Sequence, residues 1–421
     1  MADVDVDPTN PLFPEFWVRS EAEIDADLAG LQQAGGVTFH DEPMPPPELG
    51  LPEGSGAWVL TNHADILQVS KAADVFSSAE GITVSNLPPE FLEFFSSMIA
   101  MDDPRHARLR RIVSAGFTPG MLKQLEDSVQ DVAKQIVDDI APKGHVDFVV
   151  DVAAALPLKI VCDLMGVPES EFKFVFDRTN VILGVTDPEY AVEGTDPVTA
   201  LLTAGGDLAN LMNEVAVSKK GGDGTDLTSQ LINADLADDE LTSADLASFF
   251  ILLVVAGNET TRNAISWGLK YLTDNPDQQA LWAADFEGVG PSAVEEIVRL
   301  ASPVTYMRRT ALSDTTIGDQ AIAEGDKVCM FYLAANRDPA VFEDPTSFKV
   351  TRDPNHHVGF GGPGPHFCLG AHLARREILV MFRELFNRVP DIHASGDPEL
   401  LLSSFIHGIK HMPAEFTPVG D

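Results

Sequence analysis

The order of apolar and polar positions predicts a chain built mainly from helices. From about residue 105 onward, apolar residues recur every three or four positions, and Pro and Gly interrupt the pattern between segments. The expected helices cover residues 120–140, 151–165, 169–184, 200–218, 243–273, 292–301 and 368–388. Short strand patterns occur at 57–60, 315–317, 326–330 and within 405–416. The pattern predicts a mainly α fold with small β-sheet regions.

The domain organisation and the compartment follow from simple features of the chain. No repeat, low-complexity linker or sharp change of composition divides it, which predicts one domain over residues 1–421, with 1–56 as an N-terminal lead-in segment. The longest apolar run, 249–256, is far shorter than the ~20 residues of a membrane span, so a buried helix is expected there. Because the N-terminus is acidic, a secretory signal is not expected there. Three widely spaced cysteines, Cys162, Cys329 and Cys368, fit a reducing cytoplasm.

The charge of the chain restricts its partners. A formal net charge of −37 disfavours nucleic acids and anionic membranes. Basic residues nevertheless gather in two stretches, one with Arg105, Arg108, Arg110, Arg111 and Lys123 and the other with Arg375, Arg376 and Arg383. These two stretches are either a docking site for an acidic partner or ordinary solvated helix faces.

One cysteine has unusual surroundings. Cys368 lies in Phe360-Gly-Gly-Pro-Gly-Pro-His-Phe-Cys-Leu-Gly370, where a glycine-rich loop gives way to a predicted helix. Free N–H groups at a helix N-terminus favour a thiolate, and the glycines leave room for a large flat ligand. A single thiolate, without a second Cys or His at zinc-finger spacing, suits an axial ligand of heme iron better than zinc. The alternative is a surface cysteine in a turn, so other parts of the chain must decide.

Three further motifs carry candidate chemistry. Within the long apolar helix, Ala256-Gly-Asn-Glu-Thr-Thr261 places Glu259 beside Thr260, either as a proton relay or as a tolerated kink. Glu296 and Arg299 have the i,i+3 spacing of an ion pair on one helix face. His106 and Arg110, spaced i,i+4, could clamp one anion or belong to a solvated basic face.

Read in this order, with Arg308-Arg309 before Cys368, the chain from about residue 57 resembles the cytochrome P450 family of heme-thiolate monooxygenases. The resemblance implies the cytochrome P450 fold, with heme b as cofactor and Cys368 as the iron ligand. It implies propionate contacts from His106, Arg110, Arg309 and His366, and a structural network of Glu296, Arg299 and Arg352. It assigns proton management at the bound oxygen to Glu259 and Thr260. The cysteine loop is one residue longer than the common family loop.

Within the family, stretches 248–263, 303–309 and 405–410 resemble actinobacterial members that oxidise methyl-branched lipids and sterol side chains. This implies hydroxylation of an apolar, methyl-branched lipid or isoprenoid at or near a terminal methyl, with O2, a ferredoxin and an NAD(P)H-dependent ferredoxin reductase as partners. The expected substrate contacts are Phe94, Leu252, Ala256, Val304, Met307 and Phe405. Trp267 has no assigned counterpart, and core packing is expected for it.

Three alternatives to this reading remain. The first is a sterol side-chain hydroxylase. The second is a peroxygenase, which the Glu259-Thr260 pair disfavours because peroxide needs no such relay. The third is a non-catalytic heme-thiolate binding or sensing protein, which the lack of a visible output segment disfavours.

Overall fold

The computed structural model describes residues 7–44, 54–86, 97–116, 119–184, 187–233 and 242–420. Cα proximity groups the chain into two compact units. Unit 1 comprises Met1–Asp102, Trp267–Arg375 and Glu399–Ile409, and unit 2 comprises Asp103–Ser266, Arg376–Pro398 and Lys410–Asp421. Two helices, α10 (Ser243–Asp274) and α14 (Ala371–Arg388), contribute residues to both units.

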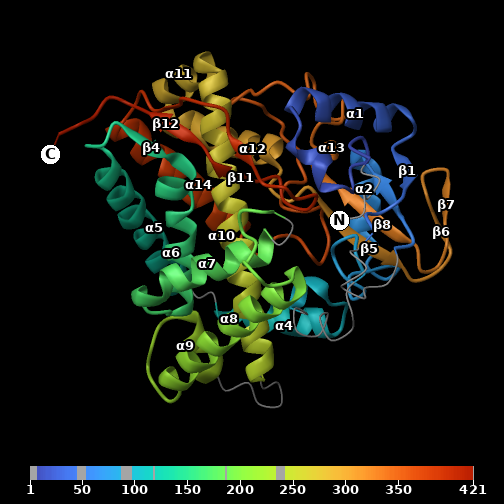
Figure 1. Cartoon of the computed structure of the whole chain (residues 1–421), viewed down its shortest axis with the longest axis horizontal. Coiled ribbons are helices and arrows are strands. Elements are labelled where there is room, and N and C mark those ends of the chain that lie inside the picture. The colour runs from blue at the N-terminus through green and yellow to red at the C-terminus, as the bar shows by residue number, and fades with distance from the viewer. Residues whose placement is uncertain are drawn as a thin grey trace. The chain divides into compact units, whose positions relative to one another are not determined.

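Unit 1 is built on a five-stranded sheet with the order β1-β2-β8-β5-β3. Figure 1 shows the N-terminal strands in blue beside the later strands in orange. The strands are β1 (Val37–His40), β2 (Ala57–Leu60), β8 (Lys327–Phe331), β5 (Tyr306–Ala311) and β3 (Phe76–Ser77). β2 and β8 are parallel and the other pairs are antiparallel. Every residue of β8 is buried, as expected for a central strand covered on both faces.

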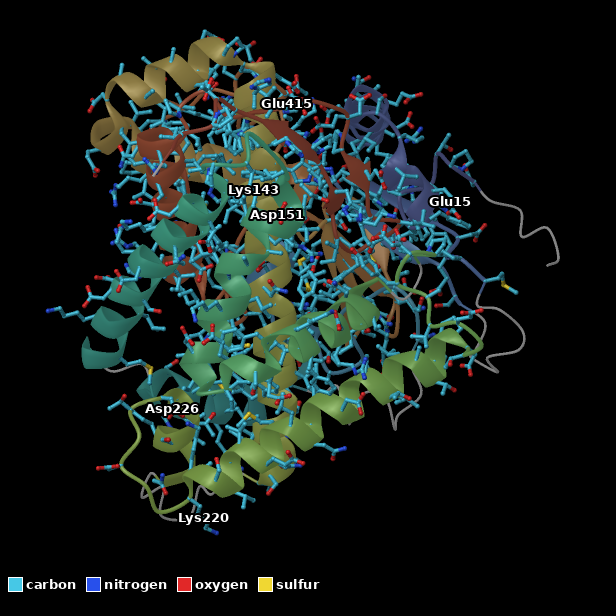
Figure 2. The ribbon with its side chains drawn as sticks, turned by 60° about the vertical axis from the view of Figure 1, so that its left-hand side comes forward. Glu15, Lys143, Asp151, Lys220, Asp226 and Glu415 are labelled. Carbon is cyan, nitrogen blue, oxygen red and sulfur yellow. The ribbon has the colours of Figure 1, made fainter. Side chains whose placement is uncertain are left out.

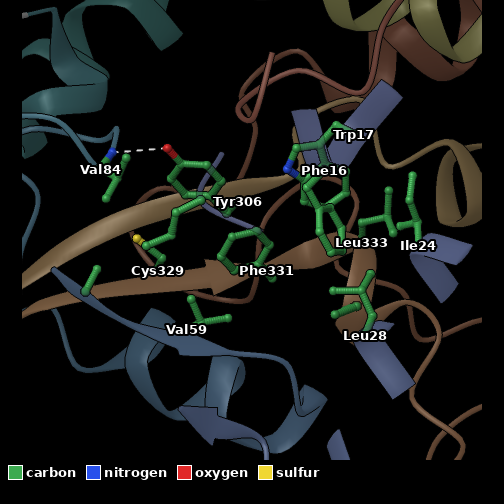
Figure 3. Close-up of a cluster of buried hydrophobic side chains, with 13 residues drawn as sticks. Phe16, Trp17, Ile24, Leu28, Val59, Val84, Tyr306, Cys329, Phe331 and Leu333 are labelled. Carbon is green, nitrogen blue, oxygen red and sulfur yellow. Dashed lines mark hydrogen bonds between the residues drawn. The ribbon is translucent and has the colours of Figure 1, made fainter. Parts of the chain in front are cut away.

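The N-terminal segment is part of the core of unit 1. It forms the 3-10 helix η1 (Pro14–Val18) and α1 (Glu21–Gln33), which begins at a capping box between Ser20 and Glu23. Trp17 stacks on Phe331 at 6.0 Å between ring centroids, and Tyr306 stacks on the same ring at 4.9 Å (Figure 3). Burial of each such large apolar side chain stabilises the fold by about 1.5–3 kcal/mol. Within the predicted lead-in, η1 and α1 are therefore integral to the fold of unit 1.

Short helices and hairpins complete unit 1. They are α2 (His63–Lys71), η3 (Met98–Ala100), α11 (Pro276–Ala284), α12 (Phe286–Ala301), α13 (Tyr332–Ala335), β6 (Thr315–Ile317), β7 (Gln320–Ile322) and β10 (Glu399–Leu400). Strand β11 (Ile409–His411) begins at Ile409, the last residue of unit 1. β6 and β7 form an antiparallel hairpin in which Thr315 pairs with Ile322.

Unit 2 consists mainly of helices. They are α4 (Arg105–Gly116), α5 (Pro119–Ile140), the π-helix η4 (Val149–Ala153), α6 (Ala155–Met165), η5 (Glu169–Glu171), α7 (Phe172–Leu183), α8 (Pro197–Lys219) and α9 (Leu227–Asn233). A small antiparallel sheet has the order β4 (His145–Asp147), β12 (Pro413–Glu415) and β9 (His393–Ala394). Between α8 and α9, Asp226 accepts a hydrogen bond from Lys219 Nζ at 2.9 Å (Figure 2 labels Asp226).

The predicted mainly α fold with small sheets is confirmed, with local differences. The helix expected from 368 begins three residues later, at Ala371, so Cys368 remains in the loop. Of the strand region 405–416, only β11 and β12 form. β5 was not predicted, because its two adjacent arginines break the apolar alternation. α10 is long and apolar enough to cross a membrane, but half of its most apolar window is buried within the protein.

Candidate active site

The cysteine loop ends in an exposed thiol. Cys368 lies three residues before α14, and its backbone N–H donates to the Phe360 carbonyl at 3.0 Å, which closes the loop. Gly361 has a φ of 83°, where a side chain would be strained. At Gly364, an added Cβ would lie 2.2 Å from the Ser70 carbonyl oxygen of α2. This glycine therefore allows the loop to pack on α2, in addition to leaving room for a ligand.

Glu295 of α12 connects the two ends of this loop. Its carboxylate bonds to His357 Nε2 at 2.8 Å before the loop and accepts from Arg375 Nη2 at 3.0 Å after it. The Arg375 guanidinium also lies over the Phe360 ring, 4.3 Å from its centroid. Burial alone raises the pKa of Glu295, but the hydrogen bonds from His357 and Arg375 outweigh it and lower the pKa to about 2. Sequence reasoning missed this carboxylate, although it directly precedes Glu296.

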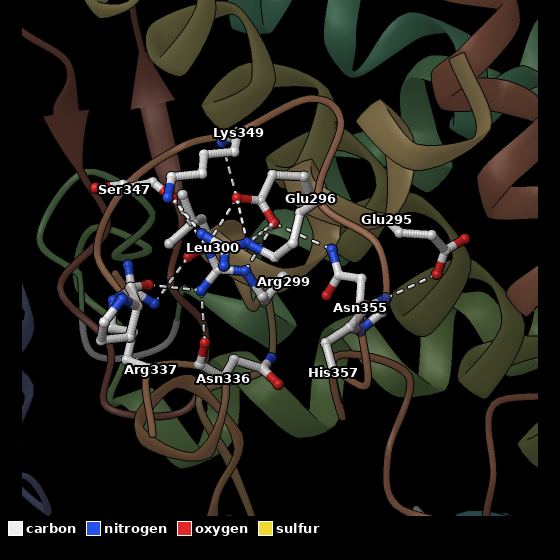
Figure 4. A network of polar contacts seen from close by, with 12 residues as sticks. Glu295, Glu296, Arg299, Leu300, Asn336, Arg337, Ser347, Lys349, Asn355 and His357 are labelled. Carbon is white, nitrogen blue, oxygen red and sulfur yellow. Dashed lines mark hydrogen bonds and ion pairs between the residues drawn. The ribbon is translucent and has the colours of Figure 1, made fainter. Parts of the chain in front are cut away.

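The predicted structural network is brought together in unit 1 (Figure 4). The Glu296 carboxylate accepts hydrogen bonds from Arg299 Nε and Nη2, both at 2.8 Å, and from Arg352 Nε at 3.1 Å. The Lys349 backbone N–H and Asn355 Nδ2 also donate to it. Arg299 donates further to three backbone carbonyls, those of Asn336, Pro345 and Ser347. Both partners of the Glu296–Arg299 pair are completely buried, and all their polar atoms are satisfied.

Two predicted propionate contacts lie in unit 1. Arg309 of β5 is buried, and its guanidinium donates to the Arg308 carbonyl at 2.8 Å. No carboxylate among the described residues lies within ion-pair distance of this guanidinium, and burial lowers its pKa. His366 Nε2 lies 3.2 Å from Ser78 Oγ. The attraction of Asp102 for the Arg309 guanidinium does not outweigh the cost of burial, so the surroundings of Arg309 favour an anionic ligand.

The other two predicted propionate contacts lie in unit 2, on the first turns of α4. His106 is buried, with Nδ1 3.3 Å from Asp103 Oδ1, and Arg110 is half-buried. One helical turn separates them, so they share a face of α4 as predicted.

The predicted relay residues of α10 have different surroundings. Glu259 is buried, and its Oε1 accepts from Arg262 Nη2 and, at 3.1 Å, from Asn263 Nδ2. Arg262 Nη1 donates in turn to Asn180 Oδ1 of α7 at 3.1 Å. The Thr260 hydroxyl instead donates to the Ala256 carbonyl at 2.7 Å, one turn earlier. Glu259 and Thr260 are adjacent but not hydrogen-bonded to each other.

The partners of Glu259 were missed from the sequence, although Glu259 and Arg262 have the same spacing as Glu296 and Arg299. Gly257 also has a packing role. A Cβ at this position would lie 2.8 Å from Val161 Cγ2 of α6, so glycine lets the two helices approach.

The predicted substrate contacts are only partly covered by the rest of the protein. Leu252, Val304, Met307 and Phe405 are half-buried, and Ala256 is exposed in the middle of α10. Phe94 lies outside the described residues. An isolated β-bridge between Val304 and Ile406 joins two of the predicted segments in unit 1.

Comparison with known proteins identifies the family. The family model described as Cytochrome P450 matches residues 208–284 and 291–389. The chain is 44% identical over 407 residues to the methyl-branched lipid omega-hydroxylase of Mycobacterium tuberculosis, covering 96% of this chain and 93% of that protein. This chain is a cytochrome P450. It is also 39% identical over 417 residues to the steroid C26-monooxygenase of Rhodococcus jostii, covering 96% of this cytochrome P450 and 86% of that protein.

A solved structure supports the same assignment. A Mycobacterium marinum cytochrome P450 in complex with pseudoionone matches with a TM-score of 0.90 and 41% sequence identity, covering 96% of this chain and 97% of that one. The protein is therefore a cytochrome P450 monooxygenase that uses heme, and the predicted family, fold, enzyme class and cofactor are confirmed.

The residues of this cytochrome P450 fit the cofactor. Cys368 presents an exposed sulfur in a loop closed by its own backbone, as a single axial ligand requires. Among the described residues, no group of three His, Cys, Asp or Glu side chains could hold a metal ion by itself. Arg309 is a buried cation that would suit a heme carboxylate.

Proposed function

We propose that this cytochrome P450 hydroxylates a methyl-branched lipid or isoprenoid at or near a terminal methyl group. The observation that carries the proposal is its 44% identity, over 96% of the chain, to a methyl-branched lipid omega-hydroxylase. The complex of a 41% identical relative with pseudoionone supports an apolar substrate.

We assign the substrate wall to Phe94, Leu252, Ala256, Val304, Met307 and Phe405. No lysine or arginine belongs to this set, and a carboxylate buried without a cation is costly. A fatty-acid head group would therefore remain near solvent, with the branched end at the reacting centre. A terminal methyl has a stronger C–H bond than its neighbours, so the wall must keep the weaker bonds away.

In this proposal, Cys368 binds the iron, and His106, Arg110, Arg309 and His366 hold the propionates. When bound, heme would supply the activation of O2, and thiolate ligation by Cys368 would favour O–O cleavage. Glu296, Arg299 and Arg352 serve as a structural network within the single domain predicted for the chain.

Glu259 and Thr260 would manage protons during this reaction. Glu259 Oε1 is bound to Arg262 and Asn263, whereas Oε2 is buried without a hydrogen-bond partner among the described residues. Oε2 is therefore the atom that can take and release a proton while the side chain stays anchored. The Thr260 hydroxyl can leave its bond to the Ala256 carbonyl and orient the water that carries the proton.

We infer that a ferredoxin and an NAD(P)H-dependent ferredoxin reductase supply the electrons, and that the enzyme is cytoplasmic. The side chains that offer contacts for an acidic ferredoxin are those of Arg105, Arg108, Arg111, Arg376 and Arg383. Of these, Arg105 has an exposed side chain 3.4 Å from Asp245.

Reconstitution with ferredoxin, reductase and NAD(P)H tests the proposal. Isopalmitic acid, in which the chain ends in two methyl groups, should give mainly the terminal alcohol, and straight-chain palmitic acid should react poorly. Turnover of cholestenone alone would favour the alternative of a sterol side-chain hydroxylase, which the 39% identical steroid C26-monooxygenase supports.

A variant at the cysteine tests the heme assignment separately. Cys368→His should abolish the red-shifted Soret band of the reduced carbon monoxide complex. An unchanged band in this variant would disprove the assignment of Cys368.

A further inference from the structure

Trp267, for which the sequence suggested only core packing, contacts a segment that carries a predicted substrate contact. It lies in α10, on the same helix as Glu259 and Thr260, and only 2% of it is exposed. Its indole Nε1 donates to the His407 carbonyl at 3.1 Å. The indole also stacks on the His407 ring, with centroids 4.4 Å apart and planes 21° apart. Trp267 therefore holds both the backbone and the side chain of His407.

His407 is fixed on its other sides as well. Its backbone N–H donates to the Pro303 carbonyl at 3.0 Å. Its Nδ1 lies 2.7 Å from the Ala301 carbonyl at the end of α12. Burial lowers the pKa of His407 to about 4, so at neutral pH the ring is uncharged and donates its Nδ1 proton to that carbonyl. The ring is thus held in one tautomer and one orientation.

Two residues before His407, Phe405 faces the start of β5. The Thr305 N–H donates to the Phe405 carbonyl at 3.0 Å, and the Val304–Ile406 bridge continues this pairing. The Phe405 ring contacts Tyr306 edge to face at 5.7 Å, and it remains half-buried. Phe405 therefore lies on a short segment outside the regular strands. Ser403 Oγ accepts hydrogen bonds from the Phe405 and Ile406 N–H groups on one side, at 3.2 and 3.1 Å, and His407 is fixed on the other side.

We propose that Trp267 and His407 are positioning residues that fix Phe405 in the substrate wall and thereby determine which carbon is hydroxylated. The inference rests on the proposed function, in which Phe405, Val304 and Met307 contact an apolar chain. Neither Trp267 nor His407 needs to contact the substrate, because their effect passes through the backbone of residues 405–407. A shift of about 1 Å in a positioning group can change a rate by about 10²-fold, which is ample to change a product ratio.

The test compares Trp267→Phe and His407→Gln with the wild-type holoenzyme, using isopalmitic acid as substrate. Trp267→Phe retains an aromatic ring but removes the donor to His407. Both variants should load heme and give the thiolate Soret band. Their ratio of terminal to internal alcohol should fall about tenfold, with less product per NAD(P)H consumed.

Tyr271→Phe is the matched control, because Tyr271 stacks on Trp267 at 5.5 Å and its hydroxyl contacts Glu21 at 3.1 Å, within unit 1. It should lower the melting temperature without changing the product ratio. A lower melting temperature with an unchanged ratio in Trp267→Phe and His407→Gln would overturn the inference and leave the pair a purely structural role.

Two further measurements separate this inference from the proposed function. Wild-type enzyme that does not oxidise isopalmitic acid would contradict the proposed substrate. In that case, spectral titration with pseudoionone still tests whether Trp267 and His407 position Phe405. Displacement of Phe405 should raise the Kd for pseudoionone about tenfold in Trp267→Phe and His407→Gln, and Tyr271→Phe should keep the wild-type Kd. Should Trp267→Phe fail to fold, Phe405→Leu, which changes the wall directly, must reproduce the altered ratio seen in His407→Gln.

Discussion

Two helices carry the same Glu-x-x-Arg spacing, and the surroundings of the two pairs differ. In α12, Glu296 and Arg299 are completely buried, and Arg352, Asn355 and backbone groups satisfy the remaining polar atoms. In α10, Glu259 and Arg262 are nearly as buried, but Glu259 Oε2 and Arg262 Nε have no partner among the described residues. The first pair is fully satisfied, whereas the second retains an unpaired carboxylate oxygen.

This difference separates two uses of a buried ion pair. Each buried charge costs several kcal/mol of desolvation, which only a complete set of hydrogen bonds offsets. A complete set also holds the carboxylate in one protonation state. Burial raises the pKa of Glu296, but the hydrogen bond from Arg299 and the other donors outweigh burial, so the pKa is lowered overall. An incomplete set is less stabilising but leaves an oxygen able to exchange a proton. We therefore expect the α12 pair to control folding and the α10 pair to control turnover.

Glu296→Gln should have the largest effect on stability. It leaves Arg299 and Arg352 without their anion in a buried site, which should cost about 3–5 kcal/mol of unfolding free energy. Urea unfolding and the heme content of the purified protein measure this loss. Asp177→Asn, which removes an exposed i,i+4 partner of Lys173, is the control and should change stability by less than about 0.5 kcal/mol. Equal effects of the two substitutions would show that the α12 network is not structural.

Glu259→Gln should lower turnover more than stability. Loss of a proton-transfer group should reduce the rate of product formation by about 10²-fold, with the thiolate Soret band retained. The stability loss should be smaller than in Glu296→Gln, because fewer hydrogen bonds disappear and Arg262 keeps Asn180 as a partner. Stopped assays of product against NAD(P)H consumption, with urea unfolding in parallel, measure both effects.

The double variant Glu259→Gln/Arg262→Met sharpens this comparison. Replacing both members of a buried ion pair by neutral groups of similar volume is often nearly neutral for stability. The double variant should therefore regain most of the lost unfolding free energy while turnover stays low. Recovery of turnover together with stability would mean that Glu259 acts only in folding.

Glu295, which precedes Glu296 on α12, is less buried than Glu296, so its replacement should have a smaller effect on stability. Its pKa lies at about 2 instead of 4.5, so its contribution to stability is fully present above about pH 4.5 and is lost as the pH falls toward 2. Glu295→Gln should cost on the order of 3 kcal/mol at most at neutral pH, and less in acid. The Soret band should disappear at a higher pH in this variant than in wild type. Glu343→Gln, at an exposed position, should leave this acid midpoint unchanged.

The sequence predicted those features that depend on local pattern. The long helices follow from apolar periodicity, and the cysteine loop is recognisable because glycines, Cys368 and the next helix are contiguous. The Glu296–Arg299 pair was predicted from its i,i+3 spacing, whereas the Glu259–Arg262 pair, which has the same spacing, was missed. The order of the motifs then supplied the family resemblance, and the comparisons confirmed the family.

The other missed contacts join segments far apart in the chain. Nothing in the sequence near Glu295 indicates that His357 and Arg375 will meet there, and Asn180 reaches Arg262 only because α7 packs on α10. The contact of Trp267 with His407 likewise joins residues separated by 140 positions. Strand β5 was missed because burial of its arginines by tertiary packing overrides their polar character.

The smallest effect is expected at a third ion network, which is partly open to water. In unit 2, His411 bonds to Asp147 through Nδ1 at 2.5 Å and to Glu189 through Nε2 at 2.8 Å, and Lys410 pairs with Glu189 and Asp187. Burial lowers the pKa of His411, but the hydrogen bonds that its ring donates to the two carboxylates outweigh this effect and raise the pKa overall. The charged ring can donate from both nitrogens, whereas the neutral ring can donate from only one.

The stabilisation from His411 should therefore be complete below about pH 6.5 and should disappear as the pH rises through the elevated pKa. Because the ring is about one-third exposed, solvent screening limits the effect to about 0.5 kcal/mol. The unfolding free energies of wild type and His411→Gln, measured with urea, should thus differ at pH 6 and converge near pH 9. The control is His145→Gln, at an exposed position on β4, which should match wild type at both pH values. If the difference in unfolding free energy between wild type and His411→Gln grew with pH, the neutral ring would be the stabilising form. The expected link between the exposure of an ion network and its contribution to stability would then not hold for His411.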